Sequence, residues 1–314
     1  MRIESFAYIG SSEFAAIILE GIMARRYVPK LVITQADKAQ GRKLLLAPTP
    51  VGNLAEQRSL PVIKPDDINS DEVYELLQTL DLQILITASY GGMIGRRLRK
   101  MCPYAAVNLH PSLLPRYRGA SPIQSALLNG DKISGTSLFR LSARLDAGAV
   151  LVKRETPILP GENYSALHDR LAHISTELLV QYLTAPDSEC YHPQKQDDSN
   201  ASYAAKIEKP DTWIDWNLPA TQIKNKIRAL SYSPGAQSSY KNQTIKIMEA
   251  EALDLPASGI AGSFASLYKD IGFTVNTGAG QLLIKQMQSS GKKLLSAWSW
   301  QLGARLCPSD RFGS

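Results

Sequence analysis

The chain has 314 residues, of which 44% are hydrophobic and 20% are charged, and its formal net charge is +6. This composition excludes a disordered chain, because it supplies enough apolar side chains for a core. No apolar run reaches the roughly 20 residues that a membrane helix needs. Cys102, Cys190 and Cys307 lie far apart, which argues against a disulfide framework and a zinc site. The chain opens without a charged leader and an apolar block, so we expect a cytoplasmic protein.

The charge is distributed unevenly along the chain. Residues 1–183 carry a net +4, residues 184–202 carry −3 and residues 203–314 carry +5. The acidic stretch is polar, contains proline and has no periodicity, which is typical of a linker. We therefore expect a domain over 1–183, a linker over 184–202 and a second domain over 203–314. Two basic domains suit a polyanion such as RNA, although charge alone fits a merely soluble basic protein better.

The first half of the chain alternates strand and helix patterns. Strand-like apolar runs cover residues 3–9, 30–34, 61–64, 82–88 and 105–109. Helical patterns cover a segment after Gly10-Ser11-Ser12, where serine can cap a helix, and residues 51–58 and 71–80, and a loop is expected over 35–50. Buried strands joined by helices predict an α/β fold with a Rossmann-like, doubly wound and mostly parallel sheet. Ligands of such sheets bind beyond the carboxyl ends of the strands.

The remaining patterns change character along the chain. Residues 136–141 and 149–155 are strand-like, and a long helical pattern covers 164–183. Beyond the linker come one helical segment over 220–230 and strand-like runs over 244–252, 272–276 and 282–287. Short strands with one helix predict a small OB-like β-barrel. No G-x-G-x-x-G follows the first strand, which argues against a dinucleotide-dependent dehydrogenase.

Three polar residues could carry chemistry at the end of the sheet. Asn108 and His110 lie two apart on a strand, so both side chains project from one face at its carboxyl end. An amide beside an imidazole can donate to the oxyanion of an acyl-transfer intermediate. Asp146 lies on a later loop, and its carboxylate near His110 would orient the ring for proton transfer. Taken singly, each residue could equally cap a strand end or form a turn.

These residues belong to a longer pattern. The run N-L-H-P-S-L-L-P-R-Y-R-G at 108–119, with Gly135-Thr136 and Leu145-Asp146-x-Gly148 after it, resembles the folate-dependent formyltransferases. Gly41-Arg42 in the loop, together with Ile214-Asp215-Trp216 near the C-terminus, resembles the members of that family that formylate a charged initiator tRNA.

The resemblance implies specific roles. It places Asn108, His110 and Asp146 at the catalytic positions, with 10-formyltetrahydrofolate as donor and the methionine amine of charged initiator tRNA as acceptor. It implies folate contacts from Ser112, Leu113, Leu114 and Pro115, and from the segment Tyr90, Gly91, Gly92, Met93 and Ile94. It implies tRNA contacts from Lys38, Arg42, Lys43, Lys206, Lys292 and Lys293. We expect a monomer that uses no metal and contacts no membrane.

Other functions fit the same residues. The Asn-His-Asp set is also compatible with a formyltransferase acting on a nucleotide-linked amino sugar, or with a hydrolase that releases formate from the same folate. A non-catalytic RNA-binding protein that keeps the sheet as a scaffold is a third possibility. The intact Asn108, His110 and Asp146 favour an enzyme, and the C-terminal motifs favour tRNA.

Overall fold

The computed structural model describes residues 2–40, 45–231 and 233–313. The chain divides into two compact units that do not follow chain order. The first unit comprises residues 1–122, 133–157 and 168–204, and the second comprises 123–132, 158–167 and 205–314. The second unit thus includes two short segments from the half that the sequence predicts to be one domain.

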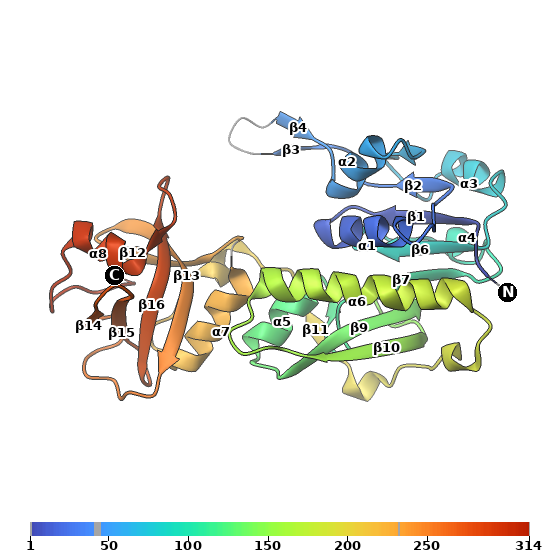
Figure 1. Ribbon diagram of the computed structural model, residues 1–314. Coiled ribbons are helices and arrows are strands. Elements are labelled where there is room, and N and C mark those ends of the chain that lie inside the picture. The colour runs from blue at the N-terminus through green and yellow to red at the C-terminus, as the bar shows by residue number, and fades with distance from the viewer. Residues whose placement is uncertain (1, 41–44, 232, 314) are drawn as a thin grey trace. The chain divides into compact units, whose positions relative to one another are not determined.

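Among the described residues of the first unit, seven strands form one sheet in the order β10-β9-β7-β6-β1-β2-β5. The strands from β10 to β2 are labelled in Figure 1. Five neighbouring strands are parallel: β1 (Phe6–Gly10), β2 (Leu31–Ile33), β5 (Val62–Ile63), β6 (Ile84–Ala88) and β7 (Ala106–His110). Two antiparallel strands complete the sheet: β9 (Ile133–Arg140) and β10 (Val150–Pro157). The predicted doubly wound, mostly parallel sheet is confirmed, and its strand order reverses between β1 and β6.

Helices cover both faces of this sheet. One face is covered by α1 (Glu13–Met23), α2 (Pro50–Gln57) and the part of α6 (Tyr164–Thr184) that belongs to the first unit. The other face is covered by α3 (Asp71–Gln78) and the short α4 (Arg96–Arg99). The predicted serine cap is present, because the Ser12 side chain accepts from the Ala15 amide at the start of α1. The β1 residues alternate between the two faces, since Tyr8 donates to α1 at Ala15 while Ala7 and Ile9 join the opposite core.

Two expectations for the first unit need correction. Residues 35–50, expected as a loop, contain a hairpin of β3 (Lys38–Gln40) and β4 (Leu45–Ala47). The segment expected to be an aperiodic linker over 184–202 contains short 3-10 turns, η1 (Glu189–Tyr191) and η2 (Asp198–Asn200). The two residues after it form β11 (Tyr203–Ala204), which pairs with β8 (Arg118–Gly119). Polar side chains that bond to backbone and to buried arginine give no hydrophobic period, so periodicity cannot detect such packing.

The second unit is built on an antiparallel sheet with the strand order β12-β13-β16-β15-β14. Its strands are β12 (Ala236–Tyr240), β13 (Gln243–Leu253), β14 (Phe264–Tyr268), β15 (Gly272–Asn276), β16 (Gln281–Ser289) and the short β17 (Leu295–Ser296). Single bridges from Phe312 to Tyr240 and from Arg311 to Ser263 join the C-terminal tail to both edges of the sheet. The result is a small, partly closed antiparallel barrel.

Helices and aromatic side chains fill the second unit. Its helices are α5 (Pro122–Leu128), η3 (Lys209–Thr212), α7 (Ala220–Leu230) and α8 (Ala297–Ala304). Of these, α7 matches the predicted bounds, while α5 and α8 were not predicted. Phe312 stacks against Phe273 and Tyr240 in the core, and the rings of Trp216 and Trp300 pack beside it at a tilt. Across the ranges that the structure describes, no helix is both long and apolar enough to span a membrane.

Candidate active site

Asn108 and His110 occupy the end of β7, as the sequence predicts. Thr87, on the neighbouring strand β6, lies opposite Asn108 in the parallel register. Its buried hydroxyl donates to Asn108 Oδ1 at 2.7 Å and lies 3.0 Å from the Val107 carbonyl oxygen. No hydrogen-bond partner for Asn108 Nδ2 is found among the described residues, so this amide nitrogen remains available as a donor.

The His110 ring is buried, and each of its nitrogens faces an oxygen atom. Nε2 lies 2.8 Å from the Tyr117 carbonyl oxygen. A carbonyl oxygen only accepts, so Nε2 carries a proton. Nδ1 lies 3.7 Å from Asp146 Oδ2, which is within ion-pair range but beyond hydrogen-bond distance. The ring therefore faces the carboxylate with the nitrogen that can gain or lose a proton.

Asp146 lies where the predicted loop brings it, beside His110. Its Oδ2 accepts from the Gly119 amide at 2.8 Å, and its side chain is only 12% exposed. Its backbone has φ +48°, in the left-handed region that aspartate tolerates better than most side chains. The structure thus brings all three predicted catalytic residues together.

The loop after β7 is held by internal hydrogen bonding and by contacts with β9 and β10. Ser112 Oγ donates to the Arg116 carbonyl, and Ser137 Oγ donates to the Ser112 carbonyl. Leu114 is buried against Phe139, its amide donates to Ser137, and its carbonyl accepts from Lys153. Of the four residues predicted to contact folate here, only Leu113 and Pro115 are partly exposed.

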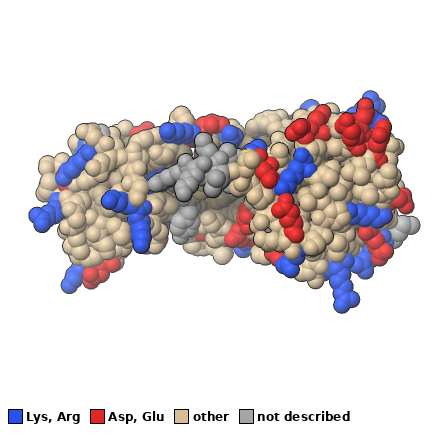
Figure 2. Space-filling view, turned by 90° about the horizontal axis from the view of Figure 1, so that it is seen from above, with Lys and Arg blue, Asp and Glu red and all other residues tan. Residues whose placement is uncertain are grey.

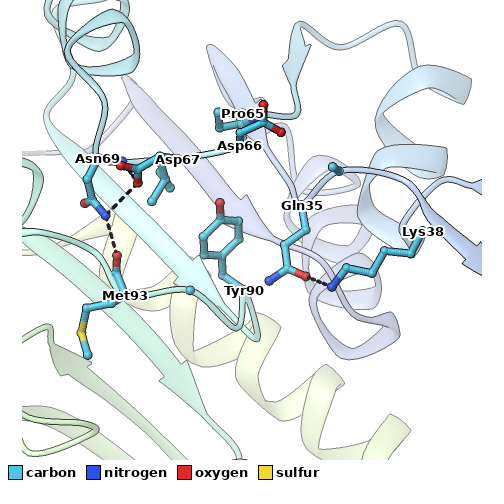
Figure 3. Close-up of a pocket in the computed structure, with 11 residues that line it drawn as sticks. Gln35, Lys38, Pro65, Asp66, Asp67, Asn69, Tyr90 and Met93 are labelled. Atoms are coloured by element: carbon cyan, nitrogen blue, oxygen red, sulfur yellow. Dashed lines mark hydrogen bonds between the residues drawn. The ribbon is translucent and has the colours of Figure 1, made fainter.

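A pocket of about 360 Å³ opens at the carboxyl ends of β2, β5 and β6 (Figure 3). Three predicted folate residues, Tyr90, Gly92 and Met93, line it. Figure 3 shows Tyr90 between Gln35 and Asn69, which donates to the Met93 carbonyl at 2.9 Å. The pocket adjoins β6, which neighbours β7, the strand that carries Asn108.

The remaining residues of the Tyr90 segment shape the pocket indirectly. Gly91 has φ +83°, and a Cβ there would lie 3.1 Å from Gln35 Nε2. Ile94 is buried in the core beneath α4. Burial, and to a smaller degree the Asp67 carboxylate, raises the pKa of Tyr90, so its hydroxyl stays protonated and can act as a donor.

The predicted tRNA contacts are spread over both units. Lys38 lines the pocket of Figure 3, where its ammonium donates to Gln35. Lys206, paired with Glu208 at 3.5 Å, and Lys292 and Lys293 are exposed on the second unit. On the visible face of that unit, Lys and Arg side chains are scattered and do not form one patch (Figure 2). Arg42 and Lys43 lie outside the described residues.

Three further residues, Thr87, Arg118 and Gln196, complete the site. Thr87 interrupts an otherwise apolar buried strand, and a buried hydroxyl needs a partner, so its position was a usable signal. Arg118 lies within the run 108–119 that resembles the family, yet its side chain is only 1% exposed and contacts Gln196 and Asp198. Gln196 lies in the polar stretch expected to be a linker and gave no signal. Within the described ranges, no three His, Cys, Asp or Glu side chains cluster as a metal site would require.

Two family models match the chain. The model described as formyl transferase matches residues 1–183, and the model described as formyl transferase, C-terminal domain, matches residues 206–305.

Relatives match over nearly the whole chain. The methionyl-tRNA formyltransferase of Thermotoga neapolitana is 37% identical over 296 residues, which is 94% of each protein. That of Methylobacillus flagellatus is 37% identical over 310 residues, covering 98% of this chain and 99% of the relative. Among solved structures, the N-formyltransferase of Helicobacter canadensis with folinic acid and dTDP-3-aminofucose shares the fold. Its TM-score is 0.66 at 19% identity, over 91% of this chain and 99% of that protein.

Proposed function

We propose a function for this chain from the family to which it belongs, the methionyl-tRNA formyltransferases. It transfers the formyl group of 10-formyltetrahydrofolate to the α-amine of methionine on initiator tRNA. The observation that carries this proposal is the convergence of Asn108, His110 and Asp146 at the carboxyl end of β7. Acyl transfer needs an oxyanion donor and a proton acceptor at one point, and this set supplies both.

The chemistry proceeds through a tetrahedral intermediate. The neutral amine attacks the formyl carbon, and the formyl oxygen gains negative charge as the new C–N bond forms. The Thr87 hydroxyl binds Asn108 Oδ1 and so orients the amide, which lets Asn108 Nδ2 donate to this oxygen. His110 adds a second donor when Nδ1 is protonated. The bond from the formyl carbon to N10 of the folate then breaks, and the nitrogen leaves with a proton.

His110 and Asp146 manage the proton that the amine loses. Asp146 Oδ2 faces His110 Nδ1 at 3.7 Å, so a proton released by the amine can reach the pair directly or through one water. The proton bound to Nε2 is held by the Tyr117 carbonyl and takes no part. Proton transfer in this assignment therefore runs through Nδ1.

The folate donor lies along the carboxyl edge of the sheet. The pocket that Tyr90, Gly92 and Met93 line has a volume within the range of small-molecule sites. It adjoins β6, the strand next to β7, so a ligand of folate length can reach from this pocket to Asn108. Leu113 and Pro115 are the residues of the 112–115 loop that can touch such a ligand. The folinic acid complex of the Helicobacter protein supports a folate at this fold.

The tRNA is bound by basic residues of both parts of the chain. Residues 1–183 form the catalytic domain and 203–314 the tRNA-binding domain. The tRNA is contacted by Lys38, Arg42 and Lys43 of the first and by Lys206, Lys292 and Lys293 of the second. The net charges of +4 and +5 on these parts support a polyanionic acceptor. The enzyme acts as a cytoplasmic monomer.

The test offers one donor and three acceptors. The protein is incubated with 10-formyltetrahydrofolate and either methionyl initiator tRNA, a nucleotide-linked amino sugar, or water alone. We expect formylated methionyl-tRNA as the main product. Formylated sugar or free formate as the main product would contradict the proposed acceptor, and RNA binding without turnover would contradict an enzyme.

A further inference from the structure

We infer that Gln196, from the segment expected to be a linker, is a positioning residue for Asp146. Its side-chain amide holds the loop that carries this carboxylate at its place beside His110. The inference rests on the proposed function, because it assigns Gln196 an effect on formyl transfer through Asp146.

The Gln196 amide uses every hydrogen-bonding position that it has. Its Nε2 donates to the carbonyl oxygens of Asp146 and Gly148, each at 2.7 Å. Its Oε1 accepts from Arg118 Nε at 3.1 Å and Nη2 at 2.8 Å. Reversing the amide would set its oxygen against two carbonyls and its N–H groups against a guanidinium. One orientation is therefore enforced from both sides.

Arg118 anchors this amide to the core of the first unit. Its guanidinium is buried and also donates to Asp198 Oδ1 at 2.9 Å. Its backbone amide donates to the Ser202 carbonyl, and Arg118 and Gly119 pair with Tyr203 and Ala204. Removing the partners of a buried guanidinium leaves an uncompensated charge, which strongly destabilises the folded state. The contacts of Arg118 are therefore held firmly in place.

The same segment reaches Asp146 and His110 by three routes. Gln196 binds the Asp146 backbone, Ala204 pairs with Gly119, whose amide donates to the Asp146 carboxylate, and Ser202 Oγ accepts from the Tyr117 amide. Tyr117 in turn accepts from His110. The Gln196 contact is the direct one of the three, because its side chain binds the backbone of Asp146 itself.

Asp146 needs such support. Its left-handed φ of +48° is strained for most residues with a Cβ, so surrounding contacts must hold the loop in this conformation. At 3.7 Å His110 makes no direct hydrogen bond to the carboxylate, which is held by the Gly119 amide at 2.8 Å. A misplacement of about 1 Å at a reacting group can lower a rate roughly a hundredfold.

The sharpest variant is Gln196→Glu. Glutamate keeps an acceptor for Arg118, and so preserves the anchor, but it removes both N–H donors and sets an oxygen against two carbonyls. We expect kcat to fall by about tenfold to a hundredfold, with both KM values within about twofold of wild type. Gln194→Ala is the matched control, because Gln194 is exposed and its bonds to Val150 are made by the backbone. It should retain wild-type rates.

A double-mutant cycle separates positioning from general destabilisation. In the Asp146→Asn background, Gln196→Glu should lower kcat no further, because the group that it positions is already disabled. A loss of the same factor in both backgrounds would overturn the inference. So would a Gln196→Glu enzyme whose kcat lies within about twofold of wild type.

A second readout does not depend on turnover. The ring nitrogen NMR signals of His110, identified by their loss in His110→Asn, report the position of Asp146. Gln196→Glu should shift them in the direction produced by Asp146→Asn, and unchanged signals would overturn the inference. If wild type failed to formylate the tRNA, the proposed function would fail, and these signals would still decide whether Gln196 positions Asp146.

Discussion

The Thr87 hydroxyl and the Asn108 amide oxygen are joined by a 2.7 Å hydrogen bond across two neighbouring parallel strands. This bond holds the amide oxygen inside the sheet and leaves the amide nitrogen to the reacting centre. Thr87→Val keeps the shape of the side chain but removes the donor, so the amide gains rotational freedom. We expect kcat to fall about tenfold with little change in KM, as steady-state kinetics would show. Thr87→Ser retains the hydroxyl and should stay near wild type, and equal losses in both variants would refute this role.

Replacing Asn108 should lower kcat far more than replacing its partner Thr87. Removing a single oxyanion donor typically costs about a hundredfold to a thousandfold in kcat, so we expect a loss of that size in Asn108→Ala. KM for donor and acceptor should change little, since the interaction strengthens only in the transition state. Asn53→Ala, on the exposed side of α2, is the matched control. A kcat for Asn108→Ala within about threefold of wild type would rule out this assignment.

Gly148 lets the Asp146 loop pass close to β9. A Cβ at this position would lie 1.7 Å from the Arg140 carbonyl oxygen, so Gly148→Ala must displace the loop. We expect a loss of about 1 to 3 kcal/mol in the free energy of unfolding, measured in urea, and a clear drop in kcat. Gly303→Ala in α8 is the control, because a Cβ added there would meet no described atom within 4 Å and alanine favours the helix. Gly148→Ala with wild-type stability and rate would contradict the close approach.

Asp198 should make the protein sensitive to acid. Arg144, and then Arg118, lower the pKa of this carboxyl below its ordinary value of 3.8. Because the folded pKa lies below the unfolded one, the stabilisation is complete above about pH 4 and is lost as the pH falls through the folded pKa. The difference in unfolding free energy between wild type and Asp198→Asn should therefore be constant from about pH 5 to 7 and shrink below about pH 4. A difference that grows on acidification would contradict these ion pairs.

Much of the fold follows from local pattern. The runs of β1, β6 and β7 are buried and mostly apolar, and the capping serine of α1 precedes a clear helical period, so these elements could be predicted. The strand β12 could not, because Ala236–Tyr240 places two serines among its five residues and lacks a strong apolar alternation. The hairpin of β3 and β4 could not be predicted either, because the proline and glycine residues around it are typical of a loop.

The site could be predicted only in part. Asn108 and His110 are two residues apart, so their common face follows from strand geometry. Asp146 taken singly fits a turn equally well, so its assignment rested on the combination with these two residues and on the resemblance to a family. Gln196 acts through backbone carbonyls 48 and 50 residues away, and no sequence period encodes such contacts. The pairing of Arg118 with Asp198 likewise depends on how the segment before β11 folds back, which is a property of tertiary structure.

The most direct test of the account is a single-turnover reaction with enzyme in excess over methionyl initiator tRNA and 10-formyltetrahydrofolate labelled in the formyl carbon. We expect the label to appear in the methionine of the tRNA, and Asn108→Ala and Asp146→Asn each to slow this transfer by about a hundredfold or more. Label released as formate, or transfer at the wild-type rate in both variants, would contradict it.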